Sequence, residues 1–548
     1  MLRRFVLING LLCSTSLLAL PAGAIEKITQ PKLIVVLVVD GLPQEQVMRY
    51  RDQYGQGGFR RLLEQGAWYS DAHQAHGVTV TAVGHAAILT GAYPYQHGII
   101  ANEWIDSRTG ESIYCTQDTN YQYLGEDTKP ADGTAPTNLH VSTVGDELRY
   151  ATGNRSKVVT ISGKDRGAIL LGGKAGTAYM YMKNSGNFAS TSYYMQSHPT
   201  WVQQYQANRP QDRFYGKEWQ PLLADAAYAN DADDAIISDP KDRFPFKYTS
   251  KSGKPDAEYY GKLLTGPFVD EMTLDFARAA VDGENLGHNP AGAPDLLGVS
   301  LSSHDYVNHA FGPESRMSHD HLQRLDRLLS NFFSYLDKRV GLENAVVILT
   351  ADHGFPNTPE FSRAMKRDAQ RINSKAMMEA LNQHLNEQFG IDKLAARWSG
   401  PQVLLDYTLM AQKKLNSEEV ETSAAHFLLS YPGIADAFTR TQFEHGALPA
   451  TRIGKLMQRA WNRQVSGDIM IVTKPYWYFG SGNHGTSHGS PYSYDTNVPL
   501  LIMGKNRIKP GAYNQYAEIV DIAPTLSEIL HIRPPSGSEG RILGEVLN

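Results

Sequence analysis

Residues 33–41 read LIVVLVVDG, an unbroken aliphatic run that ends in an acidic residue, Asp40, and a glycine. Such a run predicts a parallel β-strand that is buried on both of its faces. Side chains at the carboxyl end of a parallel strand lie at the edge of the sheet where ligands bind. The run therefore predicts a central strand that presents Asp40 at the functional edge of a sheet.

The same design recurs at three later places in the chain. Apolar runs at 158–161, 296–301 and 345–349 lead into the polar segments Ser162-Gly163-Lys164-Asp165-Arg166, Ser302-Ser303-His304-Asp305 and Thr350-Ala351-Asp352-His353. Helical patterns lie between the runs, most clearly at 322–336, where Leu and Phe recur with the helical period. Strands that alternate with helices predict an α/β sandwich with a mostly parallel central sheet between two layers of helices.

Two stretches interrupt this alternation. Residues 175–290 are rich in Tyr, Gly, Asp and Pro, whereas residues 356–465 look mainly helical and carry few strand signals. We expect both to be insertions over the active-site edge, within a single catalytic domain that spans residues 25–548.

Residues 1–24 have the pattern of a secretory signal peptide. Arg3 and Arg4 form a basic start, residues 5–20 are mostly apolar, and Ala22-Gly23-Ala24 fits a cleavage site of small residues. The alternative is a membrane anchor, but the apolar stretch is shorter than the ~20 residues that a spanning helix needs. We therefore expect an exported protein, periplasmic or secreted, without stable membrane insertion.

The composition is that of a folded globular enzyme. The chain has 548 residues, of which 41% are hydrophobic and 20% are charged, and it can bury a large core. Its formal net charge of −5 gives no electrostatic basis for binding nucleic acid. Of the two cysteines, Cys13 would leave with the signal peptide, so the mature chain can form no intramolecular disulfide. We expect Cys115 to be a small buried residue.

Six potential metal ligands lie at predicted strand ends or in loops on the same edge of the sheet: Asp40, Asp305, His309, Asp352, His353 and His488. Asp305 and His309 are four residues apart, so on a helical turn they point the same way and can hold one ion. Each motif alone is most often an ion pair or a helix cap. Together, their mixed oxygen and nitrogen ligands suit two zinc ions better than calcium or magnesium, which prefer oxygen.

A threonine-containing segment, TVTAVGH at 79–85, precedes a predicted helix. A threonine hydroxyl is a poor nucleophile at neutral pH, but a bound metal ion favours its alkoxide form. Backbone N–H groups at the start of a helix would also face an incoming phosphoryl group. The alternative is that Thr81 only caps the helix, which we would prefer without the metal ligands.

These motifs resemble those of the alkaline phosphatase superfamily, and within it the single-chain bacterial alkaline phosphatases with a threonine nucleophile. The nucleotide pyrophosphatase/phosphodiesterases are relatives of that group. The resemblance covers essentially the whole mature chain, from Val38-Val39-Asp40-Gly41 to Pro491-Tyr492-Ser493-Tyr494-Asp495-Thr496 and the following strand at 498–503. The order of the motifs along the chain matches the order in the family.

The resemblance implies a division of the ligands between two zinc ions. Asp305, His309 and His488 would hold one ion. Asp40, Asp352 and His353 would hold the other, which would also bind Thr81.

The resemblance to the monoesterase subgroup further implies that Asn102, Lys164 and Arg166 contact the phosphate oxygens that the metals do not hold. Charged and amide donors suit these oxygens, and a diester lacks one of their charges. The alternative for residues 164–166 is a solvated surface turn. The implied protein is a monomer that hydrolyses small phosphate monoesters through a phosphothreonine intermediate.

Two other functions compete with this one. A phosphodiesterase or nucleotide pyrophosphatase would keep the same ligands and nucleophile, and a non-catalytic zinc or phosphate-binding protein would keep the fold. The sequence has no Cys-x-Pro-x-Arg motif or serine equivalent, which argues against a sulfatase. The histidines near the motifs that we assign to no metal are His73, His76, His85, His97, His304 and His484.

Overall fold

The computed structural model describes residues 30–106, 109–232 and 243–548. The strands of its largest sheet are β1 (Leu33–Val39), β2 (Ala67–Tyr69), β6 (Val158–Ser162), β7 (Thr177–Tyr181), β8 (Phe188–Ala189), β11 (Asp295–Leu301), β12 (Ala345–Thr350), β19 (Leu500–Met503) and β20 (Gly511–Tyr513). Among the described residues this sheet has nine strands, in the order β20-β2-β19-β12-β1-β11-β6-β7-β8. The predicted signal peptide lies outside the described residues.

The centre of the sheet is parallel. Strands β12, β1, β11, β6 and β7 run in the same direction, whereas β19 and β8 pair antiparallel to their inner neighbours. Every residue of β1, β6, β11 and β12 is buried, because helices cover both faces. The four strands predicted from apolar runs are therefore confirmed, and so is the mostly parallel α/β fold.

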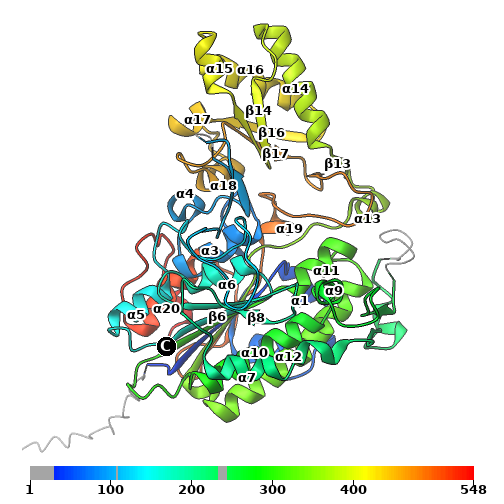
Figure 1. Cartoon of the computed structure of the whole chain (residues 1–548). Helices are drawn as coiled ribbons and strands as arrows, with labels where there is room; N and C mark the ends of the chain where they lie inside the picture. Colours follow the sequence, from blue (N-terminus) through cyan, green and yellow to red (C-terminus); the bar gives the residue numbers. More distant parts are fainter. Residues whose placement is uncertain (1–29, 107–108, 233–242) are drawn as a thin grey trace, which may run out of the picture.

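Helices form a layer on each side of the sheet (Figure 1). Helices α7 (Thr200–Ala207), α10 (Phe268–Gly283) and α12 (Arg316–Arg339) lie on one side, and α3 (Thr81–Thr90) and α6 (Asp165–Gly172) lie on the other. The apolar face of α12 predicted at 322–336 is buried in the main core, from Leu322 to Leu336. The described part of the chain contains no helix with the length and hydropathy needed to cross a bilayer.

Shorter elements complete this body. The helices are α1 (Gln44–Arg49), α2 (Phe59–Gln65), α4 (Pro94–His97), α5 (Val144–Ala151), α9 (Ala257–Lys262), α11 (Ser303–Phe311), α13 (Pro359–Ala364), α19 (Ser493–Thr496) and α20 (Ile522–Leu530). The strands are β3 (Ala72–His73), β4 (Glu103–Ile105), β5 (Ser112–Tyr114), β9 (Glu218–Trp219), β10 (Phe246–Lys247) and β21 (Ala517–Glu518).

Between β12 and β19 the chain forms a second, smaller unit, which we call the cap (residues 371–479). Its helices are α14 (Ser374–Phe389), α15 (Tyr407–Gln412), α16 (Ser417–Ser430), α17 (Arg440–Glu444) and α18 (Arg452–Ala460). Its strands are β13 (Arg371–Ile372), β14 (Ala395–Ser399), β15 (Gln402–Leu405), β16 (Ile434–Thr439), β17 (Ile469–Thr473) and β18 (Tyr478–Phe479). Strands β14, β15, β17 and β16 form a sheet that the sequence did not predict, packed with α14 and α16 around a separate hydrophobic core.

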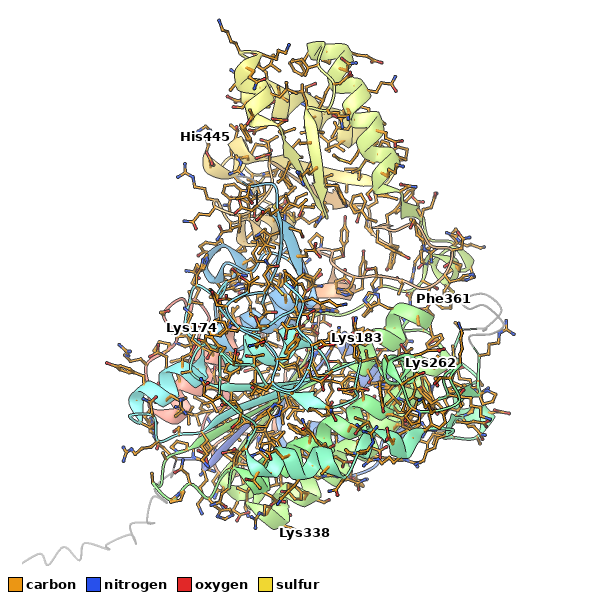
Figure 2. All side chains as sticks on the ribbon, in the orientation of Figure 1. Lys174, Lys183, Lys262, Lys338, Phe361 and His445 are labelled. Atoms are coloured by element: carbon orange, nitrogen blue, oxygen red, sulfur yellow. The ribbon has the colours of Figure 1, made fainter. Side chains whose placement is uncertain are left out.

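The cap stands above the body in Figure 1. Figure 2 labels His445 on the cap and Lys338 at the opposite end of the body, so the molecule is long in the direction that joins them. The stretch at 175–290, expected to be an insertion, also contributes β7, β8 and α10 to the sheet and its helical cover. The limits of the two insertions stay predictions.

Candidate metal centre and active site

The carboxyl ends of the parallel strands deliver the acidic residues to one place. Asp40 follows β1 directly, Asp352 lies just beyond β12, and Asp305 lies in the first turn of α11, which follows β11. Gly41 has a left-handed backbone (φ 72°), and a Cβ atom there would lie 3.1 Å from Asp305 Cα. A glycine at this position therefore permits the close approach of the end of β1 to α11.

The six predicted ligands form two groups in the structure. One group is Asp305, His309 and His488, and the other is Asp40, Asp352 and His353. Within each group, one nitrogen or oxygen atom from every residue lies within 4.8 Å of the others. These are the groups that the family resemblance implies. The structure thus has two candidate metal-binding triads.

Unpartnered polar atoms support metal binding by these triads. Asp40 Oδ1, Asp305 Oδ1 and His353 Nε2 are buried and have no hydrogen-bond partner among the described residues. Buried polar atoms are nearly always paired, because leaving one unpaired costs about 1–3 kcal/mol. Cations held between the carboxylates and imidazoles would satisfy all three atoms.

The three histidines are oriented so that one nitrogen faces the triads. Nδ1 lies 2.9 Å from Thr486 O in His309, 3.0 Å from Gly354 O in His353 and 2.7 Å from Thr79 O in His488. A carbonyl oxygen only accepts, so Nδ1 carries the proton in each ring and Nε2 keeps its lone pair. This is the arrangement that a second hydrogen bond gives to metal-binding histidines.

The two triads adjoin each other. The rings of His353 and His488 stack with their centroids 3.5 Å apart, and His353 Nε2 lies 3.9 Å from Asp305 Oδ1 of the other triad. Burial, and then the neighbouring His353, lower the pKa of His488 well below its usual range. Burial also lowers the pKa of His353. Both rings are therefore neutral, as metal ligands must be, and the geometry is consistent with one binuclear site.

Lys164 lies between the two triads. Its ammonium is 2.7 Å from Asp40 Oδ2 and 2.5 Å from Asp305 Oδ2. Burial alone would lower the pKa of Lys164, but Asp305 and Asp40 raise it above its usual value, so the side chain stays charged. Because Lys164 is only 5% exposed, the alternative of a solvated surface turn does not hold for this residue.

Arg166 and Asn102, the other two predicted phosphate contacts, are each held by a hydrogen bond. Arg166 is in the first turn of α6, and its Nη1 donates to the hydroxyl of Tyr114 at 3.1 Å. Asn102 Oδ1 accepts from the backbone N–H of Ala82 at 2.8 Å. That bond leaves the amide NH₂ of Asn102 as a donor beside the first turn of α3.

Thr81 is the first residue of α3, and the residue at the N-cap position is Val80. The Thr81 side chain does not cap the helix, because its hydroxyl is buried and has no hydrogen-bond partner among the described residues. The alternative of a purely capping threonine is therefore wrong. The free hydroxyl lies at the amino end of a helix, where N–H groups attract anions.

His85 has a part in the site that the sequence analysis missed. Its Nδ1 lies 2.9 Å from Thr81 O and 3.1 Å from Asp352 Oδ2, and its Nε2 lies 2.8 Å from Ser300 Oγ. It joins the helix that carries Thr81 to a metal-ligand candidate. Its spacing of four residues from Thr81, which places both on one face of α3, was the available signal.

The other histidines near the motifs lie outside the two triads. His304 forms a buried chain in which its Nδ1 lies 3.1 Å from His321 Nδ1 and its Nε2 lies 2.9 Å from Gln46 Oε1. His484 is exposed. Cys115 is fully buried, as expected.

A close backbone contact fixes the position of α3 relative to the metal-ligand candidates. A Cβ atom at Gly84 would lie 2.0 Å from the carbonyl oxygen of Asp352. We expect Gly84→Ala to push α3 away from the end of β12, lower the free energy of unfolding by about 1–3 kcal/mol and lower turnover sharply. Denaturant unfolding and steady-state kinetics measure the two effects.

Gly261→Ala is the matched control for this substitution. Gly261 is also helical, in α9, but a Cβ atom there meets nothing within 4 Å. Replacing it is expected to leave turnover unchanged and to stabilise the protein slightly. Normal turnover in the Gly84→Ala variant would show that the position of α3 is not critical.

Comparisons with known proteins show the family to which the chain belongs. Residues 34–495 match the sequence model of the family described as type I phosphodiesterase / nucleotide pyrophosphatase. Alkaline phosphatase PhoV of Synechococcus elongatus is 36% identical, over 95% of this chain and 94% of that protein. A protein of Myroides odoratus named calcium-transporting ATPase is 34% identical, over 96% of each chain.

Among solved structures, wild-type alkaline phosphatase PafA superposes with a TM-score of 0.87 at 34% identity, over 95% of this chain and 100% of that chain. A mutant of PafA in which one threonine, one asparagine, one lysine and one arginine are replaced matches equally well. The similarity extends over nearly the full length of both chains. The chain therefore belongs to the alkaline phosphatase superfamily, in the group of PafA- and PhoV-like alkaline phosphatases that is related to the nucleotide pyrophosphatase/phosphodiesterases.

Proposed function

We propose that this phosphatase is a two-zinc phosphate monoesterase that acts through a phosphothreonine intermediate on Thr81. The observation that carries the proposal is the buried hydroxyl of Thr81, which has no hydrogen-bond partner within the described ranges and lies on a helix joined to Asp352 through His85. The two adjoining triads, and Lys164 between them, also support the proposal. Zinc follows from the mixed carboxylate and imidazole ligands.

The reaction consists of two in-line displacements. Thr81 loses its proton to solvent, its oxygen forms a bond to phosphorus, and the bond from phosphorus to the leaving oxygen breaks. The leaving oxygen takes a proton from solvent. A water molecule then attacks phosphorus and gives up a proton, the bond to Thr81 breaks, the Thr81 oxygen is reprotonated, and inorganic phosphate leaves. Zinc ions in the two triads would favour the alkoxide and stabilise the charge on the entering and leaving oxygens.

The side chains around the triads bind the phosphoryl oxygens that the metals leave free. Lys164 is held charged and buried, and Asn102 offers an amide NH₂. Arg166 has a buried Nε atom that finds no hydrogen-bond partner among the described residues. Charge-assisted hydrogen bonds of this kind are strongest where negative charge is greatest. The four residue types replaced in the PafA mutant are the same as Thr81, Asn102, Lys164 and Arg166.

A phosphodiesterase is the second candidate, because the matching family model bears that name. A diester carries a second organic substituent in place of one anionic oxygen. A phosphodiesterase would therefore need a binding surface without excess positive charge at the position of that substituent. Here Lys164 and Arg166 both follow β6 at the site, which favours the dianionic monoester. Steady-state rates for matched aryl mono- and diesters decide between the two, and a faster diester reaction would contradict the proposal.

We also propose that the protein is exported and monomeric, on the basis of the signal pattern in residues 1–24 and the family resemblance. Its substrates would be small phosphate monoesters rather than nucleic acids.

Removing one ligand tests the metal assignment. His488→Ala leaves two of three ligands in its triad, so bound zinc is expected to fall from about two ions per chain to about one. Elemental analysis of the dialysed protein measures this. His484→Ala is the control, because His484 lies in the same loop but is exposed and outside both triads. Full zinc content in the His488→Ala variant would remove His488 from the metal site.

A further inference from the structure

A cavity of about 280 Å³ lies between the cap and the catalytic edge of the body. On the body side it is lined by Val80, the residue before Thr81, and by His488 of one triad. The reaction described above assigns no role to this cavity. Because His488 is among its lining residues, the cavity borders the triad of Asp305, His309 and His488.

Aromatic side chains form much of its wall. Trp398 of β14 and Phe479 of β18 pack with their ring centroids 4.5 Å apart, and Trp477 and Tyr478 line the cavity with them. Tyr494 of α19, which lies between the body and the cap in Figure 1, also lines it. A cavity of about 150 Å³ suffices for benzene. This one has room for a larger planar ring system, which aromatic walls favour.

Two polar atoms of lining residues are buried and lack a hydrogen-bond partner within the described part of the chain. They are Trp477 Nε1 and Asp495 Oδ1. The other oxygen of Asp495 accepts from the backbone N–H groups of Gly489 and Ser490, at 3.1 Å and 2.8 Å, which fixes the carboxyl group. Burial raises the pKa of Asp495 to about 8, so near neutral pH this group can donate a hydrogen bond as well as accept one. Unpaired polar atoms in an apolar wall are the usual means by which a pocket orients its ligand.

We propose that this cavity binds the leaving group of the substrate, and that it prefers a planar aromatic alcohol whose polar edge hydrogen-bonds with Trp477 and Asp495. The inference rests on the proposed function. Helix α3, which carries Thr81, packs against Asp352 through Gly84 and His85, so attack by Thr81 comes from the side of the triad of Asp40, Asp352 and His353. In-line displacement then expels the leaving oxygen toward the triad of Asp305, His309 and His488. His488 is the member of that triad that lines the cavity.

A second cavity, of about 580 Å³, borders the same triad at His309. Phe246, Phe311, Lys247 and Lys262 line it. None of its lining residues, all within the described ranges, has a buried side-chain polar atom without a partner. It therefore lacks the unpaired groups that would orient a leaving group. In the test below, this second cavity is the competing binding site for the leaving group.

The test compares 2-naphthyl phosphate, 6-quinolyl phosphate and methyl phosphate as substrates of the zinc-loaded enzyme. For each protein we take the ratio of kcat/KM between two substrates. Comparing this ratio in a variant with that in the wild type cancels the difference in intrinsic reactivity between the substrates. Trp398→Ala is expected to lower the naphthyl-to-methyl ratio by about tenfold or more. Trp477→Phe keeps a ring but removes the N–H group, so it is expected to lower the quinolyl-to-naphthyl ratio severalfold.

Two control variants separate this cavity from general effects. Trp461→Phe is the control for Trp477→Phe. It makes the same replacement elsewhere in the cap, at a buried tryptophan that does not line the cavity. Phe246→Ala alters the second cavity. Both are expected to leave the two ratios within twofold of wild type. Unchanged ratios in Trp398→Ala and Trp477→Phe, or a fall in the naphthyl-to-methyl ratio only in Phe246→Ala, would overturn the inference.

Binding of the product alcohol keeps the two proposals distinguishable. If the wild type hydrolyses none of the three esters, the proposed function fails. Calorimetry with 2-naphthol then tests separately whether the cavity binds an aromatic alcohol. Weaker binding of 2-naphthol to Trp398→Ala than to wild type supports an aromatic site there. Equal binding, or none to either protein, contradicts it.

Discussion

Thr81→Ala is expected to lower the turnover of phosphate monoesters by about 10⁴-fold or more, as loss of a covalent nucleophile does in other hydrolases. The substitution removes a hydroxyl that is buried at the start of α3 and has no hydrogen-bond partner in the described part of the chain. Bound zinc should stay at the wild-type level, because each triad keeps its three side chains. Steady-state kinetics with an aryl phosphate and elemental analysis measure the two quantities.

Thr90→Ala provides the control on the same helix. Thr90 is also buried in α3, but its hydroxyl donates to the carbonyl of Ala86 and lies at the far end of the helix. Its replacement should affect stability more than turnover. Undiminished turnover in Thr81→Ala, with Thr90→Ala also active, would exclude Thr81 as the nucleophile.

Arg166→Ala is expected to lower monoester hydrolysis by about 10²–10³-fold and diester hydrolysis far less. A loss of about 10²–10³-fold is typical when an enzyme loses one hydrogen-bond donor that stabilises the charge developing in the transition state. The difference arises because a diester lacks one of the anionic charges that Arg166 would meet. Matched aryl mono- and diesters, assayed with the same two proteins, give both values.

Tyr114→Phe tests whether Arg166 acts from a fixed position. The hydroxyl of Tyr114 accepts from Arg166 Nη1 and itself donates to Asp165 Oδ1 at 2.6 Å. Its removal should reproduce the Arg166→Ala pattern with a smaller amplitude. Equal losses on mono- and diesters in the Arg166→Ala protein would contradict the proposed charge contact.

The central sheet and its functional edge were predictable because local pattern and tertiary position coincide there. A run such as 33–39 can be buried only inside a layered fold, and the polar residues after it must then lie at the sheet edge. The four strands found in the structure match the predicted runs to within one residue at either end. Asp40, Asp305 and Asp352 follow directly from this rule.

The local sequence pattern could not predict how the six ligands divide between the two triads. Spacing alone pairs Asp305 with His309 on one turn of helix, but nothing local assigns His488, which comes from a loop far along the chain. That assignment came from the family resemblance, and the structure brings the same residues together. The role of His85 was missed because its contacts with Asp352 and Ser300 depend on how α3 packs against the strand ends.

The cap was predicted least well. Its strand β14 has two exposed residues and a register shift against β15, so it shows neither an apolar run nor strict alternation. Such a strand is specified by its neighbours in the sheet rather than by its own sequence. The cavity beside His488 depends on this unpredicted sheet, and the leaving-group inference could therefore come only from the structure.

The central claim is that the phosphoryl group passes through Thr81, and the stereochemistry at phosphorus tests it most directly. Hydrolysis of a monoester whose phosphoryl group is made chiral with oxygen isotopes gives a product of defined configuration. Two successive in-line displacements, first by Thr81 and then by water, predict net retention. Net inversion would mean that water attacks the substrate in a single step, and it would contradict the account.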